Sequence, residues 1–216
     1  DYGLGELLED VSKTNIPRIR FTTSHPWDFT DKMIEVISKY PNIMPSIHLP
    51  LQSGSSRILK LMGRRYTKES YLELFDKMKE KIKDVTISTD IIVGFPGETE
   101  EDFLETLDVV NHCKYDNSFT FIYSPRENTP ASRLKDDIAL SVKEERLQRL
   151  NNLVNKYFLE KNKKLEGTIQ EVLVEGKSLK KDDCYYGYTK TNKLVNFTGC
   201  DINEGEIVLV KITEAK

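Results

Sequence analysis

The 216-residue sequence has few cysteines, no excess of positive charge and no long hydrophobic run. Its cysteines, Cys113, Cys184 and Cys200, lie far apart, and none has the close spacing of a zinc or iron–sulfur site. We therefore predict no metal ligand in this chain. A sparse, odd set of cysteines indicates reduced thiols, so we expect a cytoplasmic location.

Charge and hydropathy exclude further classes of protein. The formal net charge is −3, so no global basic field indicates nucleic-acid binding, although a local patch could still bind it. No apolar run approaches the length of a membrane span, and residues 1–6 lack the regions of a signal peptide, so we expect no membrane partner. Because the sequence does not begin with methionine, we expect a fragment of a longer protein.

Strand and helix patterns alternate over the first 124 residues. Strand segments alternate polar and apolar side chains, and apolar residues at helical spacing follow the first three of them. Thr67 and Thr99 are expected to cap two of these helices. Such alternation predicts parallel strands with crossover helices. The expected strands cover residues 18–24, 46–52, 85–93 and 118–124.

Each expected strand keeps one polar face. Parallel strands covered by helices on both sides usually read as continuous apolar runs, so this departure predicts a sheet with one face on a polar cavity. A curved, barrel-like sheet explains the pattern better than a flat sheet with a bare face, and four strands make half of the usual barrel. The polar faces hold Arg20, Thr22 and Ser24; Ser46, His48 and Gln52; Thr86, Ser88 and Asp90; and Ser118, Thr120 and Ser124, with Phe119 and Phe121 on the apolar side.

The stretch from Thr89 to Thr99 joins an apolar strand to a glycine turn and then to a helix start. Gly94 and Gly97 allow the backbone to turn sharply and to approach a bound molecule closely. Ligands of barrels and open α/β sheets bind at the carboxyl edge of the strands, where this turn lies, so the stretch indicates a ligand site. Glycines present for steric reasons alone are the alternative.

The carboxyl-terminal part has a different pattern of expected secondary structure. A long helix is expected from Ser141, with Glu144 at capping-box spacing, and it connects to short strands and turns after Lys164. Several short strands without a helix predict a small all-β domain of the kind that often binds nucleic acid. The expected divisions are residues 1–140 for the partial barrel, 141–164 for the connecting helix and 165–216 for the all-β domain.

A candidate RNA-binding patch lies in this all-β domain. Residues 165–216 contain seven lysines against nine acidic residues, so any RNA contact must come from a local patch. Lysines cluster around the loops with tyrosines between them, which suits phosphate contact and base stacking. A solvated lysine face with core tyrosines is the alternative. The candidate RNA-binding residues are Lys177, Lys180, Lys181, Tyr186, Lys190 and Lys193.

Four motifs occur in order: FTTSHP at 21–26, LPLQSGS at 49–55, DIIVGFPGET at 90–99 and YSPR at 123–126. Together they closely resemble the MiaB-type tRNA methylthiotransferases of the radical S-adenosylmethionine (SAM) class, and the all-β domain resembles the TRAM module of these enzymes. The resemblance implies an α/β fold, the carboxyl-terminal half of a radical SAM barrel followed by a small all-β TRAM barrel. The family that modifies a ribosomal protein is the alternative, but the first two motifs look more like the tRNA enzymes.

For the intact enzyme, the resemblance implies transfer of a methylthio group to C2 of N6-isopentenyladenosine next to the tRNA anticodon, with SAM and two 4Fe-4S clusters as cofactors. The family's amino-terminal cluster domain and CxxxCxxC motif are absent from this sequence, so the chain alone is expected to be inactive. The expected partners are SAM and the tRNA anticodon stem-loop. An RNA-binding module without catalysis is a second hypothesis. A Schiff-base barrel enzyme is disfavoured, because no lysine lies at the expected cavity-facing strand positions.

SAM needs acceptors for its ammonium and ribose hydroxyls, donors for its carboxylate and an apolar slot for adenine. Asp90 is the natural acceptor, and Arg126 is a forked donor for a carboxylate or a phosphate. A strand-end role for Asp90 and a solvated Arg126 are the alternatives. The candidate SAM-binding residues are Gln52, Ser53, Asp90, Val93, Gly94, Phe95, Pro96 and Arg126, and no catalytic residue is assigned.

Overall fold

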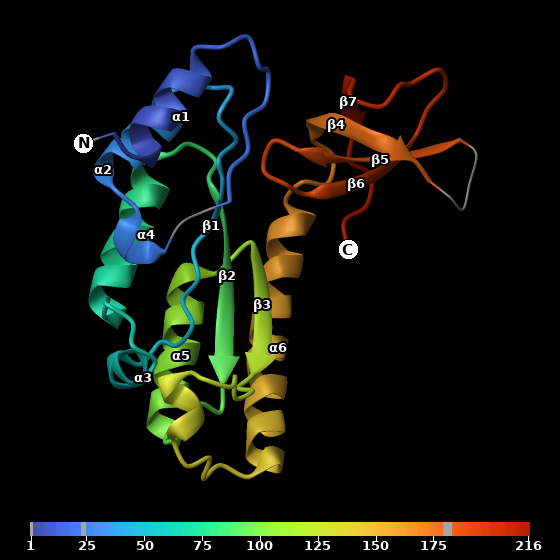
Figure 1. Cartoon of the computed structure of the whole chain (residues 1–216). Coiled ribbons are helices and arrows are strands. Elements are labelled where there is room, and N and C mark those ends of the chain that lie inside the picture. The colour runs from blue at the N-terminus through green and yellow to red at the C-terminus, as the bar shows by residue number, and fades with distance from the viewer. Residues whose placement is uncertain (1, 23–24, 179–182) are drawn as a thin grey trace.

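The computed structural model describes residues 2–22, 25–178 and 183–216. A parallel sheet with crossover helices is joined by one long helix to a separate antiparallel sheet (Figure 1). This arrangement confirms the expected fold class, an α/β part followed by a small all-β part. The parallel sheet has the order β1-β2-β3 and consists of β1 (Ser46–His48), β2 (Thr86–Val93) and β3 (Asn117–Ile122).

Helices cover the buried face of the parallel sheet. The core below β2 contains Ile87 and Ile91, both fully buried, together with Phe75 and Phe103 from two of the crossover helices. No helix formed by the described residues is long and apolar enough to cross a membrane. The helical elements of this part are α1 (Leu4–Ser12), η1 (Pro26–Asp28), α2 (Asp31–Lys39), α3 (Ser56–Leu61), α4 (Lys68–Lys81), α5 (Glu100–Cys113) and η2 (Pro130–Arg133).

The two helix caps expected from the sequence are confirmed. The Thr67 hydroxyl accepts the Ser70 N–H at 3.3 Å at the start of α4, and the Thr99 hydroxyl accepts the Asp102 N–H at 3.3 Å at the start of α5. At α5 the contact is reciprocal, because the Thr99 N–H donates to the Asp102 carboxylate at 2.8 Å. These contacts satisfy N–H groups that have no partner within a helix.

The first two expected strands are shorter than the sequence pattern indicates. In place of a strand at 18–24, the described residues form one parallel bridge, between Ile19 and Ile43. The ladder stops there because the Ser46 N–H bonds the Met44 carbonyl at 2.8 Å, so neither group is free for the next rung. β1 ends at His48 rather than 52, two residues before Pro50, which has no N–H to donate.

The side chains of β3 face the opposite way from the prediction. Phe119 and Phe121, assigned to the helix-covered side, are 49% and 51% exposed on the open side of the sheet. Thr120, assigned to the cavity side, instead donates to the Asn151 side chain of the long helix at 2.6 Å. The polar side chains assigned to β2, and Ser46 and His48 of β1, face the open side as predicted, whereas Gln52 lies beyond the end of β1 and is buried. Ser24 lies outside the described residues.

The long helix α6 (Leu140–Lys163) packs along β3 and α5. Its 24 residues give a length of about 36 Å at 1.5 Å per residue. The predicted capping box of Ser141 and Glu144 is wrong, since the helix begins one residue earlier and Ala139 at the N-cap position makes no side-chain cap. Along one face the helix buries Lys143, Arg146, Leu150, Val154 and Tyr157.

The antiparallel sheet packs near the amino ends of the parallel strands (Figure 1). The Arg18 guanidinium donates to the backbone carbonyls of Tyr188 at 2.9 Å and Glu171 at 3.0 Å. Nearby, the hydroxyl of Thr86 at the start of β2 donates to the Thr191 carbonyl at 3.0 Å. This sheet has the order β6-β5-β4-β7 and consists of β4 (Ile169–Lys177), β5 (Cys184–Thr189), β6 (Leu194–Thr198) and β7 (Ile207–Lys211).

Candidate functional site

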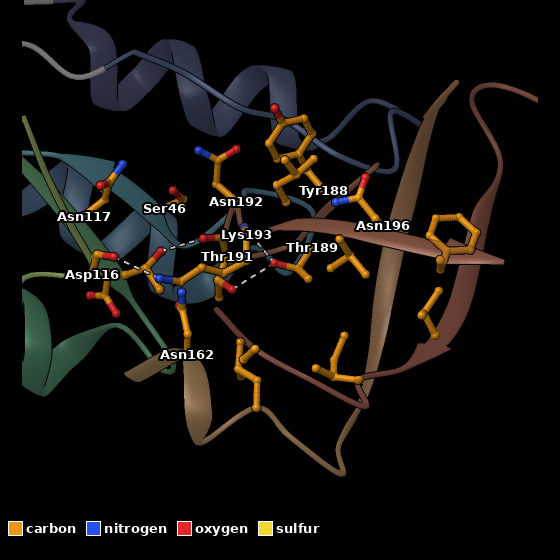
Figure 2. Close-up of a pocket in the computed structure, with 18 of the residues that line it drawn as sticks. Ser46, Asp116, Asn117, Asn162, Tyr188, Thr189, Thr191, Asn192, Lys193 and Asn196 are labelled. Atoms are coloured by element: carbon orange, nitrogen blue, oxygen red, sulfur yellow. Dashed lines mark hydrogen bonds between the residues drawn. The ribbon is translucent and has the colours of Figure 1, made fainter. Parts of the chain in front are cut away.

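A cavity of about 1270 Å³ lies between the open face of the parallel sheet and the antiparallel sheet (Figure 2). Polar side chains from consecutive strands meet on its wall, because β1 and β2 pair in parallel with Ser46 opposite Thr86 and His48 opposite Ser88. The polar side chains of β1 and β2 therefore line a common hollow as the sequence predicted, whereas those predicted for β3 do not. The parallel-sheet side contributes Arg20, Phe21, Thr22, Ser46, His48, Thr86, Ser88, Asp90, Asn117 and Phe119.

The centre of this wall is a hydrogen-bonded series of three side chains. His48 Nε2 lies 3.2 Å from the Asp90 carboxylate, and His48 Nδ1 lies 2.9 Å from the Ser88 hydroxyl. Because a carboxylate only accepts, Nε2 carries the proton in the bond to Asp90. The Asp90 side chain is 31% exposed, so a ligand in the cavity can reach its carboxylate.

The backbone of Gln52 joins the LPLQSGS segment to the end of β2. Its N–H donates to the Asp90 carbonyl at 2.8 Å, and its carbonyl accepts the Ile92 N–H at 2.9 Å. Gln52 adopts a left-handed backbone conformation with φ of 66°, which costs a non-glycine residue about 1–3 kcal/mol. Next to it, Ser53 is fully buried and its hydroxyl accepts the Ser55 N–H at 3.2 Å.

The glycine turn after β2 is held from behind by α6. Gly94 and Gly97 have φ of 70° and 79°, which favour glycine. A Cβ atom on Gly94 would lie 2.5 Å from Cγ of Lys143, so the close packing of α6 also requires glycine there. The Gly94 N–H donates to the Glu98 carboxylate at 2.8 Å, which fixes the turn from inside.

A buried ion pair anchors this turn. Arg146 Nη1 lies 2.8 Å from the Glu98 carboxylate, with the two residues 5% and 4% exposed. Burial raises the pKa of Glu98, although the Gly94 N–H and Arg146 act in the opposite direction. Sequence reasoning did not assign roles to Glu98 and Arg146. The sequence does contain a signal for this pair: Arg146 lies in helical register with the apolar Leu150 and Val154, so it belongs to the buried face of the helix. A charged residue on a buried face needs a partner of opposite charge.

Asp102 connects the glycine turn to the LPLQSGS segment. The Ser55 hydroxyl donates to its carboxylate at 2.6 Å, and Arg57 forms an ion pair with the same group. Burial opposes ionisation of this carboxyl, but the hydrogen bonds from Arg57, Ser55 and Thr99 outweigh burial and lower the pKa of Asp102. The two segments at the carboxyl edge of the sheet are therefore held together by one ionised side chain.

The other predicted SAM-binding residues lie at the carboxyl ends of the strands, beyond the cavity lining. The segment from Val93 to Pro96 is buried, and Phe95 packs edge-on against Tyr123 with ring centroids 4.9 Å apart. The Tyr123 hydroxyl, which sequence reasoning missed, is buried without a hydrogen-bond partner among the described residues. Arg126 is exposed on the following loop. Of the predicted set, Asp90 is the residue that lines the cavity.

The predicted RNA-binding residues divide between the open surface and the cavity. Tyr186 is 36% exposed on β5, and the Lys177 ammonium lies 5.5 Å from the centre of the Tyr185 ring. Lys190 is exposed and pairs with Glu171. All three of these side chains, Lys177, Tyr186 and Lys190, are exposed, so a polyanion can reach them.

Lys193 has a different position. Its ammonium donates to the Asp116 carbonyl at 2.9 Å inside the cavity, so it contributes to the junction of the two sheets (Figure 2). Lys180 and Lys181 lie outside the described residues.

The cysteines do not fit an iron–sulfur cluster. Cys113 is buried in the core, where burial raises the pKa of its thiol to about 12, while Cys184 is half-buried and Cys200 is exposed. Among the residues that the structure describes, no group of three or more His, Cys, Asp or Glu side chains could hold a metal ion.

The strand–helix sheet with a polar open face and the small antiparallel sheet define a two-part architecture that matches two known families. The Radical SAM superfamily model matches residues 1–110, about half of the chain, and the TRAM domain model matches residues 163–216. The chain belongs to the radical SAM superfamily.

Within this superfamily, the chain is similar to proteins named tRNA-2-methylthio-N(6)-dimethylallyladenosine synthase. The protein from Bacillus cytotoxicus is 57% identical over 216 residues, and that from Staphylococcus epidermidis is 56% identical over 216 residues. Each match covers 100% of this chain and 42% of the relative, so the chain spans less than half the length of these proteins. A solved structure of the radical S-adenosylmethionine methyltransferase TsrM from Kitasatospora setae, with cobalamin and a 4Fe-4S cluster bound, aligns over 77% of this chain and 30% of that chain, with a TM-score of 0.49 and 13% identity.

Proposed function

We propose that this chain is part of a cytoplasmic tRNA methylthiotransferase, which transfers a methylthio group to C2 of N6-isopentenyladenosine next to the anticodon. The observation that carries the proposal is one cavity wall of hydrogen-bonded polar side chains in a radical SAM chain that also carries a TRAM domain. The similarity to tRNA-modifying relatives runs over the full length of this chain. The reaction is proposed to use SAM and two 4Fe-4S clusters, for which this chain provides no fitting cysteine ligands.

The carboxyl edge of the parallel sheet is the proposed SAM site. Asp90 offers an acceptor for an ammonium or hydroxyl group, and its support by His48 holds the carboxylate toward the cavity. The left-handed backbone of Gln52 and the buried turn from Val93 to Pro96 lie beyond the cavity lining, at the carboxyl ends of the strands, and are proposed to contact SAM there. Arg126 is an exposed donor for a carboxylate. When bound, SAM supplies the reactive chemistry, while these residues orient it and exclude water.

The TRAM part is the proposed holder of the tRNA anticodon stem-loop. Lys177 and Lys190 offer charge for phosphate groups, and Tyr186 offers an exposed ring for stacking. Lys180 and Lys181 belong to the same proposed patch by their position in the sequence. Lys193 is proposed to act from the cavity side.

Two measurements on the 216-residue chain test this function. Calorimetric titration with SAM should show binding that Asp90→Asn weakens at least tenfold, whereas Asp108→Asn, an exposed aspartate on α5, should leave it unchanged. Titration of a labelled anticodon stem-loop should show binding that weakens as salt rises. RNA binding without any SAM binding would favour an RNA-holding module without a cofactor.

A third measurement tests the expected inactivity of the chain alone. After anaerobic cluster reconstitution, the chain should contain no stoichiometric iron and should transfer no methylthio group, because cluster ligands are missing. Robust transfer by this chain would contradict the proposal.

A further inference from the structure

Three lysines surround one carboxylate at the junction of the two sheets. Asp116, just before β3, accepts the Ile87 N–H at 2.9 Å, and the same oxygen lies 3.0 Å from Lys161 Nζ and 3.6 Å from Lys79 Nζ. Lys193 donates to the Asp116 backbone carbonyl at 2.9 Å. The lysines come from α4, α6 and the β5–β6 connection, so parts of the chain far apart in sequence build this lysine cluster.

The lysine cluster carries more positive than negative charge. Lys79 and Lys161 pair with the single Asp116 carboxylate, whereas Lys193 donates to the Asp116 backbone carbonyl and Lys79 also donates to the Val85 carbonyl at 2.7 Å. Carbonyl groups carry no net charge, so three ammonium groups are matched by one carboxylate. Burial lowers the pKa of Lys79 and of Lys193, and the neighbouring lysines add to the effect. Partly buried cations are costly unless a negative group compensates them, so the cluster is electrostatically incomplete.

The lysine cluster opens at Lys193 and Asp116 on a space that can admit a polyanion. Lys193 and Asp116 line the cavity between the sheets, and side chains of Asn117, Thr191 and Asn192 line the same end of it (Figure 2). Amide and hydroxyl groups donate hydrogen bonds to phosphate oxygens, and ammonium groups bind phosphate as point charges. A phosphate group in this opening would therefore meet hydrogen-bond donors and would supply the negative charge that the cluster lacks.

We propose that the lysine cluster is an anion site that takes a phosphate group of the RNA backbone at the junction of the two sheets. The inference rests on the proposed RNA-binding function and adds a contact that the surface patch of Lys177, Tyr186 and Lys190 does not provide. A phosphate bound here would meet Lys193 of the TRAM part and Asn117 at the start of β3 directly, while Lys79 and Lys161 act through their charge beside Asp116, so RNA binding would fasten the TRAM part to the parallel sheet.

The test compares Lys79→Met and Lys193→Met with Lys60→Met, an exposed lysine on α3 away from the junction. Methionine keeps the length of the side chain and removes its charge. Binding of a labelled anticodon stem-loop is measured at several salt concentrations, with melting curves to verify that each variant folds. Each junction variant should bind RNA about three- to tenfold more weakly and should lower the salt slope by about one, whereas the Lys60 variant should match the unchanged chain.

Inorganic phosphate provides a second arm, since it presents the same chemistry without RNA. At constant ionic strength, phosphate in place of chloride should raise the melting temperature of the unchanged chain and not of the junction variants. A phosphate effect with an unchanged RNA salt slope would assign the site to free phosphate and overturn the proposal. If the unchanged chain binds RNA but neither the salt slope nor the phosphate effect differs in the junction variants, the anion site is overturned and the proposed RNA function stands. If the unchanged chain binds no RNA, both the anion site and the proposed RNA function are overturned.

Discussion

Replacing Asp102 with asparagine should show how strongly one carboxylate holds the candidate site together. The side chain is 4% exposed and accepts hydrogen bonds from the Ser55 hydroxyl at 2.6 Å and the Thr99 N–H at 2.8 Å, as well as from Arg57. Asparagine has nearly the same shape but presents an NH2 group where one of the two oxygens lies. At least one of these donors therefore meets another donor instead of an acceptor.

The expected cost follows from these contacts. Hydrogen bonds to a charged group contribute about 1.5–3 kcal/mol each, and the Arg57 bridge adds little because Arg57 is half exposed. We expect Asp102→Asn to lower the free energy of unfolding by about 3 kcal/mol. For a chain of this length, that loss corresponds to a fall in melting temperature of about 6–12 °C.

The pH dependence provides a sharper measurement. The pKa of Asp102 is lowered in the folded chain, so its stabilisation is complete above the ordinary value of 3.8 and is lost as pH falls below it. Melting temperatures of both proteins, measured from pH 8 to pH 3, should differ by a constant amount above about pH 5 and then converge. The control, Asp108→Asn on the same helix, should stay within about 0.5 kcal/mol of the unchanged chain. An unchanged melting temperature at pH 7, or a difference that grows in acid, would refute the reasoning.

Three further substitutions test other parts of the structure. Gly54→Ala places a Cβ atom 2.4 Å from Cα of Thr106, and because two backbones meet there, we expect a loss of about 3 kcal/mol in denaturant unfolding. Glu98→Gln removes the buried charge partner of Arg146 and leaves it the more exposed Glu100 carboxylate at 3.4 Å, so it should cost about 3 kcal/mol, measured in the same way; a loss under 1 kcal/mol would contradict a buried ion pair. Arg18→Met removes two hydrogen bonds to the antiparallel sheet, so amide exchange at the junction should accelerate while exchange in β2 stays unchanged.

Local signals in the sequence predicted the starts of α4 and α5, although not that of α6. Thr67 and Thr99 cap their helices as expected, because a cap depends on a few residues that are adjacent in sequence. The alternation in β2 likewise predicted which side chains face the cavity, including Asp90. A buried and an exposed face of one strand differ in composition strongly enough to be read without a structure.

Features that depend on distant partners could not be predicted. The orientation of β3 is set by α6, whose Asn151 pairs with Thr120, so two phenylalanines lie on the open side against the usual pattern. The expected strand at 18–24 failed because a neighbouring carbonyl was already bonded within its own segment. The support of the glycine turn by Arg146 required knowledge of where α6 packs.

Helix α6 has a consequence for the size of the substrate. Its Lys143 end packs against the glycine turn and its Lys161 end reaches Asp116, so about 27 Å of helix separates the two places at 1.5 Å per residue. A nucleic-acid strand stacked at about 3.4 Å per nucleotide needs roughly eight nucleotides to cover this length. Under the proposed function, the length of α6 sets a minimum length for the RNA substrate. An isolated nucleoside or a trinucleotide is too short to be bound at the Asp116 end of the helix and to reach the glycine turn at the other end, whereas a folded hairpin is long enough.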